Sequence, residues 1–142
     1  MIAIIRISGM VEIPKGVQET LHRLRLRKKF TCVLLKESPE NEGMLYAVRN
    51  FVAYGKINRE TLAELIKKRG KTIENKKIKI DAEKIAAELL DAKIKKKLVD
   101  FGLKPFFGLH PPRGGIKSKI HFPKGVLGDN KEKINDLIRR ML

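Results

Sequence analysis

Five short segments in the first 57 residues alternate between the sequence pattern of a β-strand and that of an α-helix. Runs of β-branched and apolar residues bounded by Gly, Pro or Ser indicate strands, whereas an apolar residue every three or four positions indicates a helix. These patterns predict strands at 2–7, 31–35 and 52–57, and helices at 16–27 and 41–51. Helices that link successive strands predict a small sheet with two helices packed on one face, an α+β fold of the ferredoxin-like β-α-β-α-β kind.

The two helices of this core each have one apolar face. Residues three to four positions apart lie on the same side of a helix, so such a face packs against the sheet. Asn41 is a candidate N-cap for the second helix. The apolar faces consist of Val17, Leu21 and Leu24 in the first helix and of Met44, Leu45, Val48 and Phe51 in the second.

The remaining residues, 58–142, are predicted to extend the 1–57 core. Asn58 and Gly70 bound a predicted helix at 58–69, because Asn caps helix N-termini and Gly ends helices. Asp81 begins a second predicted helix, 81–98. A Pro- and Gly-rich basic loop, 104–128, follows. Ile134, Leu137, Ile138 and Met141 then form the apolar stripe of a closing helix, 130–142.

The chain is strongly basic. It has 142 residues, 32 of them Lys or Arg against 16 Asp or Glu, and a formal net charge of +16. The excess of bases occurs in all parts of the chain, so the folded surface must be basic throughout. Such a charge favours a polyanionic partner, because the partner relieves the repulsion among the bases. The alternative is a basic soluble enzyme. A hydrophobic fraction of 42% excludes general disorder.

The sequence predicts a cytoplasmic protein. No run approaches the roughly 20 apolar residues of a membrane span, and the N-terminal residues lack the features of a signal peptide. Cys32 is the single cysteine, so neither an internal disulfide nor a thiolate metal cluster can form. Its place in an apolar run predicts a buried, inert thiol.

The segment 104–125 has no carboxylate and interleaves Pro and Gly with basic and aromatic residues. Pro and Gly argue against a regular helix or a central strand, so the segment is expected to form no packed element. Glycine N–H groups beside Arg and Lys can bind phosphate. The alternative is a surface loop with solvated bases. The candidate phosphate-binding residues of this segment are Arg113, Gly114, Gly115, Lys117, Lys119 and Lys124.

A second basic cluster lies at the end of the first predicted helix and consists of Arg23, Arg25, Arg27, Lys28 and Lys29. Cations near a helix C-terminus interact favourably with the helix dipole, which gives part of the cluster a structural explanation. However, the dipole interaction is worth only about 0.3–1 kcal/mol for each charge and does not require five neighbouring bases. We therefore favour a phosphate-binding patch.

No pattern of catalytic, metal or cofactor chemistry occurs in the sequence. His22, His110 and His121 are scattered, and none has a metal-ligating partner three or four residues away. The run from Gly114 to Ser118 does not have the spacing of a nucleotide-binding loop. We therefore expect no catalytic residue, no metal, no cofactor and no small-molecule substrate.

Several motifs resemble one family. They are Arg23–Arg27, Val33–Leu35, Pro39, Gly43–Leu45, Val48 and Tyr54–Gly55. They resemble the large-subunit ribosomal protein family called L-thirty in bacteria and L-seven in eukaryotes. The second half of the chain is similar to the archaeal and eukaryotic members, at Pro105–Phe106, Leu109, Pro111, Gly114–Gly115, Gly125, Gly128 and 133–141.

This resemblance covers nearly the whole chain and implies an archaeal-type structural constituent of the large ribosomal subunit. Its partners would be large-subunit rRNA and neighbouring ribosomal proteins, with no membrane contact. Two alternatives come from other classes: a free-standing RNA-binding regulator or RNA chaperone, and a nucleic-acid-processing enzyme. The strands are aliphatic, without the aromatic pair that single-strand readers carry on a sheet, so recognition of shape and phosphate is expected.

Overall fold

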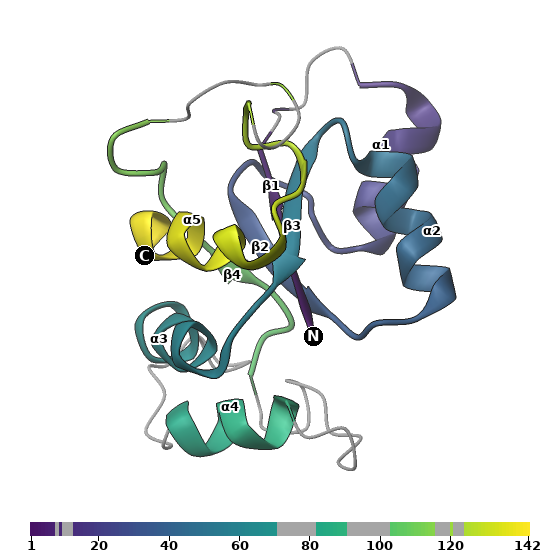
Figure 1. Ribbon diagram of the computed structural model, residues 1–142. Helices are drawn as coiled ribbons and strands as arrows, with labels where there is room; N and C mark the ends of the chain where they lie inside the picture. The colour runs from purple at the N-terminus through teal and green to yellow at the C-terminus, as the bar shows by residue number, and fades with distance from the viewer. Residues whose placement is uncertain (8, 10–12, 71–81, 91–102, 116–119, 121–123) are drawn as a thin grey trace.

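The structure is a computed structural model that describes residues 1–142 except 8, 10–12, 71–81, 91–102, 116–119 and 121–123. Figure 1 shows one sheet with helices on two sides. The elements in chain order are β1 (Ile2–Arg6), α1 (Lys15–Arg23), β2 (Thr31–Leu35), α2 (Pro39–Val48), β3 (Val52–Lys56), α3 (Arg59–Arg69), α4 (Ala82–Leu90), β4 (Phe107–Gly108), β5 (Gly128–Asp129), the 3-10 helix η2 (Lys131–Lys133) and α5 (Ile134–Met141).

The strands lie in the order β4-β2-β1-β3-β5. The central strand β1 is antiparallel to both β2 and β3, which therefore run parallel to each other. The connection from β2 through α2 to β3 crosses over β1 and makes a split βαβ unit. The α+β class and the predicted β-α-β-α-β order of the first 57 residues are confirmed.

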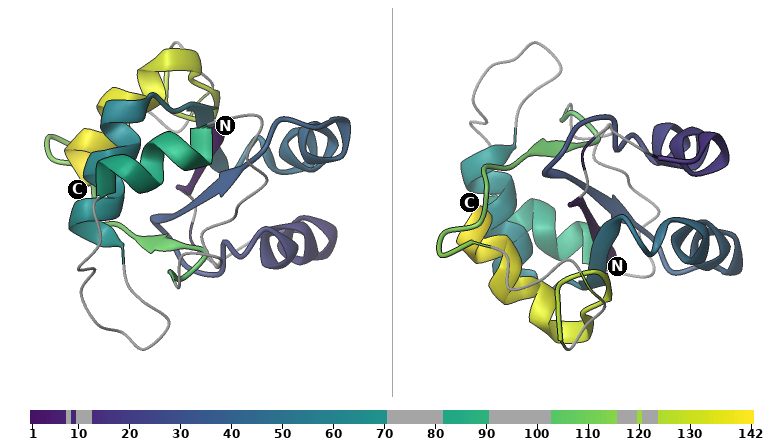
Figure 2. Two further views of the ribbon diagram at one scale, coloured as in Figure 1. Left: turned by 90° about the horizontal axis from the view of Figure 1, so that it is seen from below. Right: turned by 90° about the horizontal axis from the view of Figure 1, so that it is seen from above.

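One face of the sheet is covered by α1 and α2, as predicted (Figure 2). Ile2 and Ile4 of β1 pack there against side chains from both helices. The predicted apolar faces are confirmed, since Leu21 of α1 and Leu45 and Val48 of α2 are buried. Leu24 and Leu26, which follow α1, belong to the same cluster.

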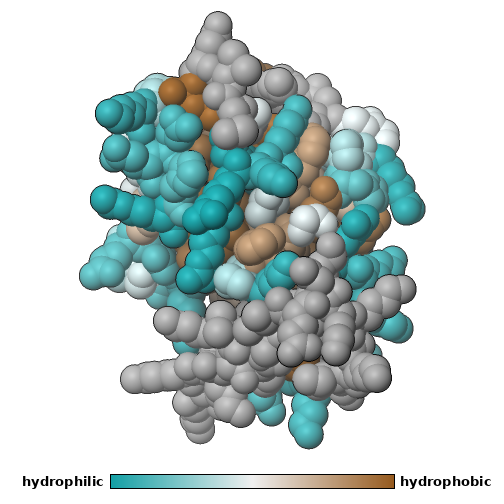
Figure 3. Space-filling view, turned by 180° about the vertical axis from the view of Figure 1, so that it is seen from behind, coloured by the Kyte–Doolittle hydropathy of each residue, from teal (hydrophilic) through white to brown (hydrophobic). Residues whose placement is uncertain are grey.

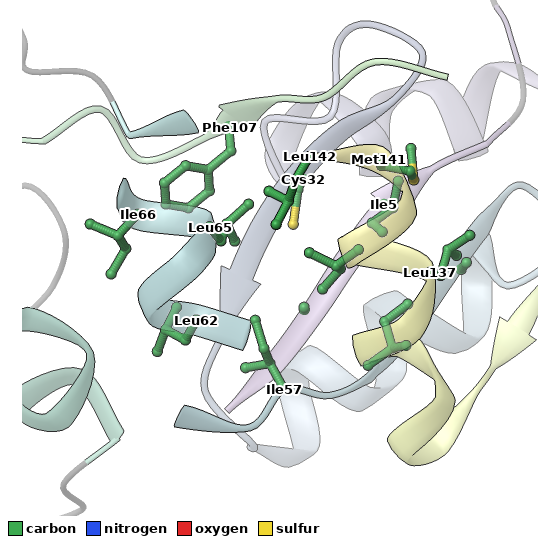
Figure 4. Close-up of a cluster of buried hydrophobic side chains, with 14 of the residues drawn as sticks. Ile5, Cys32, Ile57, Leu62, Leu65, Ile66, Phe107, Leu137, Met141 and Leu142 are labelled. Atoms are coloured by element: carbon green, nitrogen blue, oxygen red, sulfur yellow. The ribbon is translucent and has the colours of Figure 1, made fainter. Parts of the chain in front are cut away.

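The opposite face of the sheet is covered by α3 and α5, both from the region after residue 57 (Figures 2 and 4). Ala3 and Ile5 of β1 point into this second cluster, together with Leu65, Leu137 and other residues of the two helices. Because both faces are buried, the first strand is apolar at successive positions instead of alternating with polar residues. The region after residue 57 thus completes the core.

The polar side chains Asn58 and Asn135 fix the helices of this second layer. Asn58 caps α3 as predicted, because its Oδ1 accepts the N–H of Thr61 at 2.8 Å. Buried Asn135 of α5 accepts the N–H of Asn58 at 2.9 Å and donates to the carbonyl oxygen of Lys56. The α4 helix packs on α3 through Ile85, Ala86 and Leu89.

The helix α1 ends at Arg23, four residues before the predicted end. The N–H of Leu26 donates to the carbonyl oxygen of Leu21 and that of Arg25 to His22, while Arg25 has a φ of 63°. These features form a Schellman motif, in which a left-handed residue stops the helix. Glycine usually takes this position, and an arginine there gave no sequence signal.

The helix α2 begins at Pro39, and its N-cap is Ser38 rather than the predicted Asn41. The Ser38 Oγ accepts the N–H of Asn41 at 3.2 Å. Proline fits the first helical position because its missing N–H would have no partner there. The Ser-Pro pair therefore starts this helix as well as ending β2.

The expectation that segment 104–125 forms no packed element is wrong for its described residues, and so is the prediction that all of 104–128 is a loop. Phe107 and Gly108 form β4 beside β2, and Gly128 lies in β5 beside β3. Phe107 is 1% exposed and belongs to the core. Both strands are at sheet edges, where missing ladder hydrogen bonds are tolerated. Asp81 and the predicted helical residues 91–98 lie outside the described residues.

Candidate nucleic-acid interface

The residues after α1 alternate between buried and exposed side chains. Leu24 and Leu26 are 3% and 0% exposed, whereas Arg25 and Arg27 are exposed. Each leucine anchors the backbone in the core and turns the neighbouring arginine toward solvent. Lys28 and Lys29 continue the exposed run, and with Arg23, Arg25 and Arg27 they form what we call the basic loop. All five predicted bases are thus exposed within one short stretch.

Arg6, at the end of β1, is hydrogen-bonded to the backbone of the basic loop. Its side chain is 2% exposed. Nη1 donates to the carbonyl oxygen of Leu26 at 2.7 Å, and Nη2 donates to that of Gly9 at 3.2 Å. Burial lowers the pKa of the Arg6 guanidinium, but an arginine in a protein stays charged. A buried cation is therefore bound to the backbone beneath the basic loop.

The second predicted segment begins beside the end of the basic loop. Thr31 and Cys32 of β2 pair with Gly108 and Phe107 of β4. The N–H of Leu109 donates to the carbonyl oxygen of Phe30 at 3.0 Å. The structure thus brings together the basic loop and the start of residues 109–115, which are far apart in sequence.

Residues 109–115, which we call the glycine segment, are attached to the end of α5. The N–H of Arg113 donates to the carbonyl oxygen of Arg140 at 3.0 Å. In return, Arg140 Nε donates to the carbonyl oxygen of Arg113 at 3.0 Å, and its Nη2 donates to that of Gly115. The Arg140 side chain therefore shapes the backbone on both sides of Gly114.

Gly114 and Gly115 are exposed and have φ values of 81° and 77°, a conformation that glycine adopts without strain. A Cβ built on either residue would have no atom of the described residues within 4 Å, apart from its neighbours in the chain. Their backbone is thus open to a ligand. Arg113 and Lys124 are also exposed, whereas Lys117 and Lys119 lie outside the described residues.

We call the basic loop, the glycine segment and β4 together the basic edge, because β4 pairs with β2 and the N–H of Leu109 is bonded to Phe30, the residue after the basic loop. Figures 1 and 2 place β4 at the back of the molecule, opposite β5. In the view from behind, long hydrophilic side chains stand out from the left side and the centre of the surface (Figure 3). The exposed bases of the basic loop and the exposed Arg113 suit a negatively charged ligand.

The opposite edge of the sheet has mixed charge. A groove of about 830 Å³ lies beside β3 and β5, with Ile2, Leu45 and Tyr54 among its lining residues. Its charged lining residues include four carboxylates and three lysines: Glu37, Glu42, Asp129, Glu132, Lys56, Lys131 and Lys133. The two edges of the sheet therefore differ in charge, which makes the lysines beside β5 useful controls for the bases of the basic edge.

The sequence analysis missed Arg6 and Arg140. Arg6 follows Ile2 and Ile4 at the strand period of two, so it is a charge on a buried face of β1. A charged residue at a position where the strand pattern predicts an apolar one was the feature of the sequence that could have indicated Arg6. Arg140 is in the last turn of α5, where a helix dipole already explains a cation, and its bonds to the glycine segment had no signal in the sequence.

The described residues contain no cluster of three His, Cys, Asp or Glu side chains that could hold a metal ion. Within the same residues, no helix is long and apolar enough to cross a membrane. Cys32 is buried in β2, and this burial raises the pKa of its thiol to about 12. Its thiol is therefore a core side chain without thiolate reactivity at neutral pH.

Comparison with known proteins gives one consistent result. A family model described as Ribosomal protein L30p/L7e matches residues 2–52. The chain is 41% identical to the "Large ribosomal subunit protein uL30" of Archaeoglobus fulgidus, with 99% of each chain covered. Its identity to the uL30 protein of Staphylothermus marinus is 40%, over 99% of this chain and 97% of the relative. Its identity to the uL30 protein of Pyrobaculum aerophilum is 41%, over 99% of this chain and 93% of the relative.

Proposed function

Because this chain belongs to the ribosomal protein L30p/L7e family, we propose that it is a structural constituent of the large ribosomal subunit and that its basic edge binds folded rRNA. The family is one of ribosomal structural proteins and not of enzymes. A protein of the large subunit works in the cytoplasm and contacts rRNA and neighbouring ribosomal proteins.

The observation that carries the proposal is the alternation of buried leucines and exposed arginines in the basic loop. Leu24 and Leu26 fix the backbone, so that Arg25 and Arg27 project from a rigid base. Charged side chains on a fixed backbone lose less conformational entropy when they bind phosphate than charges on a flexible tail. This arrangement suits recognition of a folded RNA backbone by its shape and charge.

The glycine segment adds a second contact of a different kind. At Gly114 and Gly115 the absence of side chains leaves the main chain open, and Arg113 lies beside it. Backbone N–H groups and an arginine can together bind phosphate oxygens. We assign Lys117, Lys119 and Lys124 to the same contact. In this proposal the 1–57 region supplies the basic loop, and the 58–142 region forms an extension that supplies the glycine segment.

The test measures RNA affinity as a function of salt. Protein-free rRNA from large subunits of Archaeoglobus fulgidus is cut into fragments and titrated with the protein at several salt concentrations. Each neutralised phosphate contributes about −0.7 to −0.9 to the slope of log K against log[salt]. Replacing Arg25 and Arg27 with Ala should make this slope shallower by about one to two units.

The matched control is the Lys131→Ala, Lys133→Ala double variant, which removes two charges from the edge beside β5. It should bind RNA with the slope of the wild-type protein, because these lysines are not on the basic edge. Equal effects of the two double variants would mean that net charge alone drives binding. That result, or binding without salt dependence, would contradict the proposed function of the basic edge.

A further inference from the structure

Arg6 occupies a position of β1 at which the strand pattern predicts an apolar side chain. Ile2 and Ile4 on the same face of the strand pack against α1 and α2, and Arg6 comes next. Its side chain is 2% exposed, so it cannot itself reach a large ligand in solution. Burying a charge costs free energy unless the charge is hydrogen-bonded. The role of Arg6 must therefore come from the groups that it binds.

Two partners of the Arg6 side chain are main-chain carbonyl oxygens of loops. Nη1 donates to Leu26 at 2.7 Å and Nη2 to Gly9 at 3.2 Å. Leu26 lies between Arg25 and Arg27, the two arginines that project from the basic loop. A planar guanidinium can donate in two fixed directions at once, which fixes the relative position of the two loops.

The backbone of Arg6 extends this connection to the glycine segment. The carbonyl oxygen of Arg6 accepts the N–H of Phe30 at 2.7 Å, at the end of the basic loop. The carbonyl oxygen of Phe30 accepts the N–H of Leu109 at 3.0 Å. One residue of the central strand is thus hydrogen-bonded to the middle of the basic loop and to Phe30, which follows the loop, and through Phe30 it is connected to the second basic segment.

We propose that Arg6 is a positioning residue that holds Arg25 and Arg27 in the conformation that binds RNA. This inference rests on the proposed function of the basic edge. Arg6 makes no phosphate contact in this scheme. It raises affinity because the loop is already ordered before RNA arrives, so that less conformational freedom is lost on binding.

The experiment compares Arg6→Lys and Arg6→Met with Leu65→Ala, each at a temperature where circular dichroism shows that the variant is folded. Lysine keeps the charge but lacks the planar fork, and methionine removes the charge. Leu65 belongs to the cluster on the other face of the sheet, so Leu65→Ala lowers stability without touching the basic loop. The probe is the same rRNA fragment from Archaeoglobus fulgidus.

Both Arg6 variants should bind the RNA roughly three- to tenfold more weakly than the wild-type protein. The slope of log K against log[salt] should stay unchanged, because no phosphate contact is lost. Leu65→Ala should bind like the wild-type protein. Wild-type affinity in a folded Arg6→Lys protein would overturn the inference. A shallower slope would also overturn it, since it would mean that Arg6 itself neutralises a phosphate.

A measurement on the unchanged protein covers the case in which neither Arg6 variant folds. Amide hydrogen exchange should show that the N–H groups of Leu26 and Phe30 are protected in the free protein to the same degree as those of β2. Exchange at the rate of an unstructured chain would overturn the inference. Failure of the proposed function would look different, since the Arg25→Ala, Arg27→Ala protein would then bind RNA like the wild-type protein.

Discussion

The backbone of Gly55 packs directly against the carbonyl oxygen of Lys131, so that no side chain fits between β3 and η2. A Cβ added to Gly55 would overlap that oxygen and would lie 2.9 Å from the Cβ of Ile134. Gly55→Ala must therefore push η2 and the start of α5 away from the sheet. We expect a loss of about 1–3 kcal/mol in the free energy of unfolding, measured by urea denaturation.

The control for this substitution is Gly43→Ala in α2. Among the described residues, a Cβ at Gly43 would meet no atom within 4 Å outside its chain neighbours and the backbone of its own helix, and alanine favours a helix more than glycine does. This variant should gain about 0.5–1 kcal/mol of stability. If both variants changed stability in the same direction, the close packing of η2 on β3 would be wrong.

Leu24→Ala should damage the fold rather than the RNA contact. Leu24 is 3% exposed and packs in the cluster under α1 and α2. Emptying a buried leucine site typically costs about 2–5 kcal/mol. Thermal denaturation should show a lower melting temperature, and Val17→Ala, at a partly buried position of the same cluster, should cost less. An unchanged melting temperature would place Leu24 outside the core.

The local periods of the sequence were sufficient to predict β1, β2 and β3 and the apolar faces of α1, α2 and α5. These elements are long enough for each period to repeat. The strands β4 and β5 have two residues each and depend on contacts with distant strands, so no local pattern marks them. The left-handed backbone conformation of Arg25 could not be predicted either, because glycine and not arginine usually adopts it.

The candidate site shows the same division between local and distant information. Exposure of Arg25 and Arg27 follows from their alternation with leucines. The proximity of the glycine segment depends instead on the bond from Leu109 to Phe30, which joins residues far apart in the chain. For the same reason the sequence did not indicate that Arg6 is bonded beneath the basic loop.

Arg25→Gly should stabilise the protein and weaken RNA binding. Arg25 has a φ of 63°, a conformation that costs an ordinary residue about 1 kcal/mol and glycine almost nothing. The melting temperature should therefore rise. The RNA affinity should fall, and the salt slope should become shallower by about 0.7–0.9, as for one phosphate contact.

Lys131→Gly is the matched control, because Lys131 also has a positive φ, 51°, and lies beside the opposite edge of the sheet. It should also raise the melting temperature while RNA affinity stays the same. Unchanged RNA affinity in Arg25→Gly would mean that the strained arginine serves no binding role.

The thiol of Cys32 should make stability depend on alkaline pH. Burial in the cluster of Figure 4 raises its pKa from an ordinary value of 9.0 to about 12, so the folded protein keeps the proton that the unfolded chain loses. The stabilising contribution is complete below pH 9 and is lost as the pH rises from 9 toward 12. Over that range the free energy of unfolding should fall by about 1.4 kcal/mol per pH unit more in the wild-type protein than in Cys32→Ala. Urea denaturation at several pH values measures both, and parallel curves would contradict a buried, protonated thiol.

Gly114→Ala and Gly115→Ala should each weaken RNA binding without changing the number of charges. Both residues have positive φ values, so an alanine must adopt a strained conformation at a cost of about 1–2 kcal/mol or rearrange the segment. Rearrangement would break the bonds that Arg140 makes to Arg113 and Gly115.

The methyl group added by either substitution would also project into open space, where it would keep a phosphate away from the backbone. RNA titration should therefore show lower affinity even though every cation of the protein remains. Gly43→Ala is the control, since this exposed residue of α2 has free space around a Cβ and no positive φ. It should bind RNA like the wild-type protein, whereas equal affinity in all three variants would remove the glycine segment from the proposed interface.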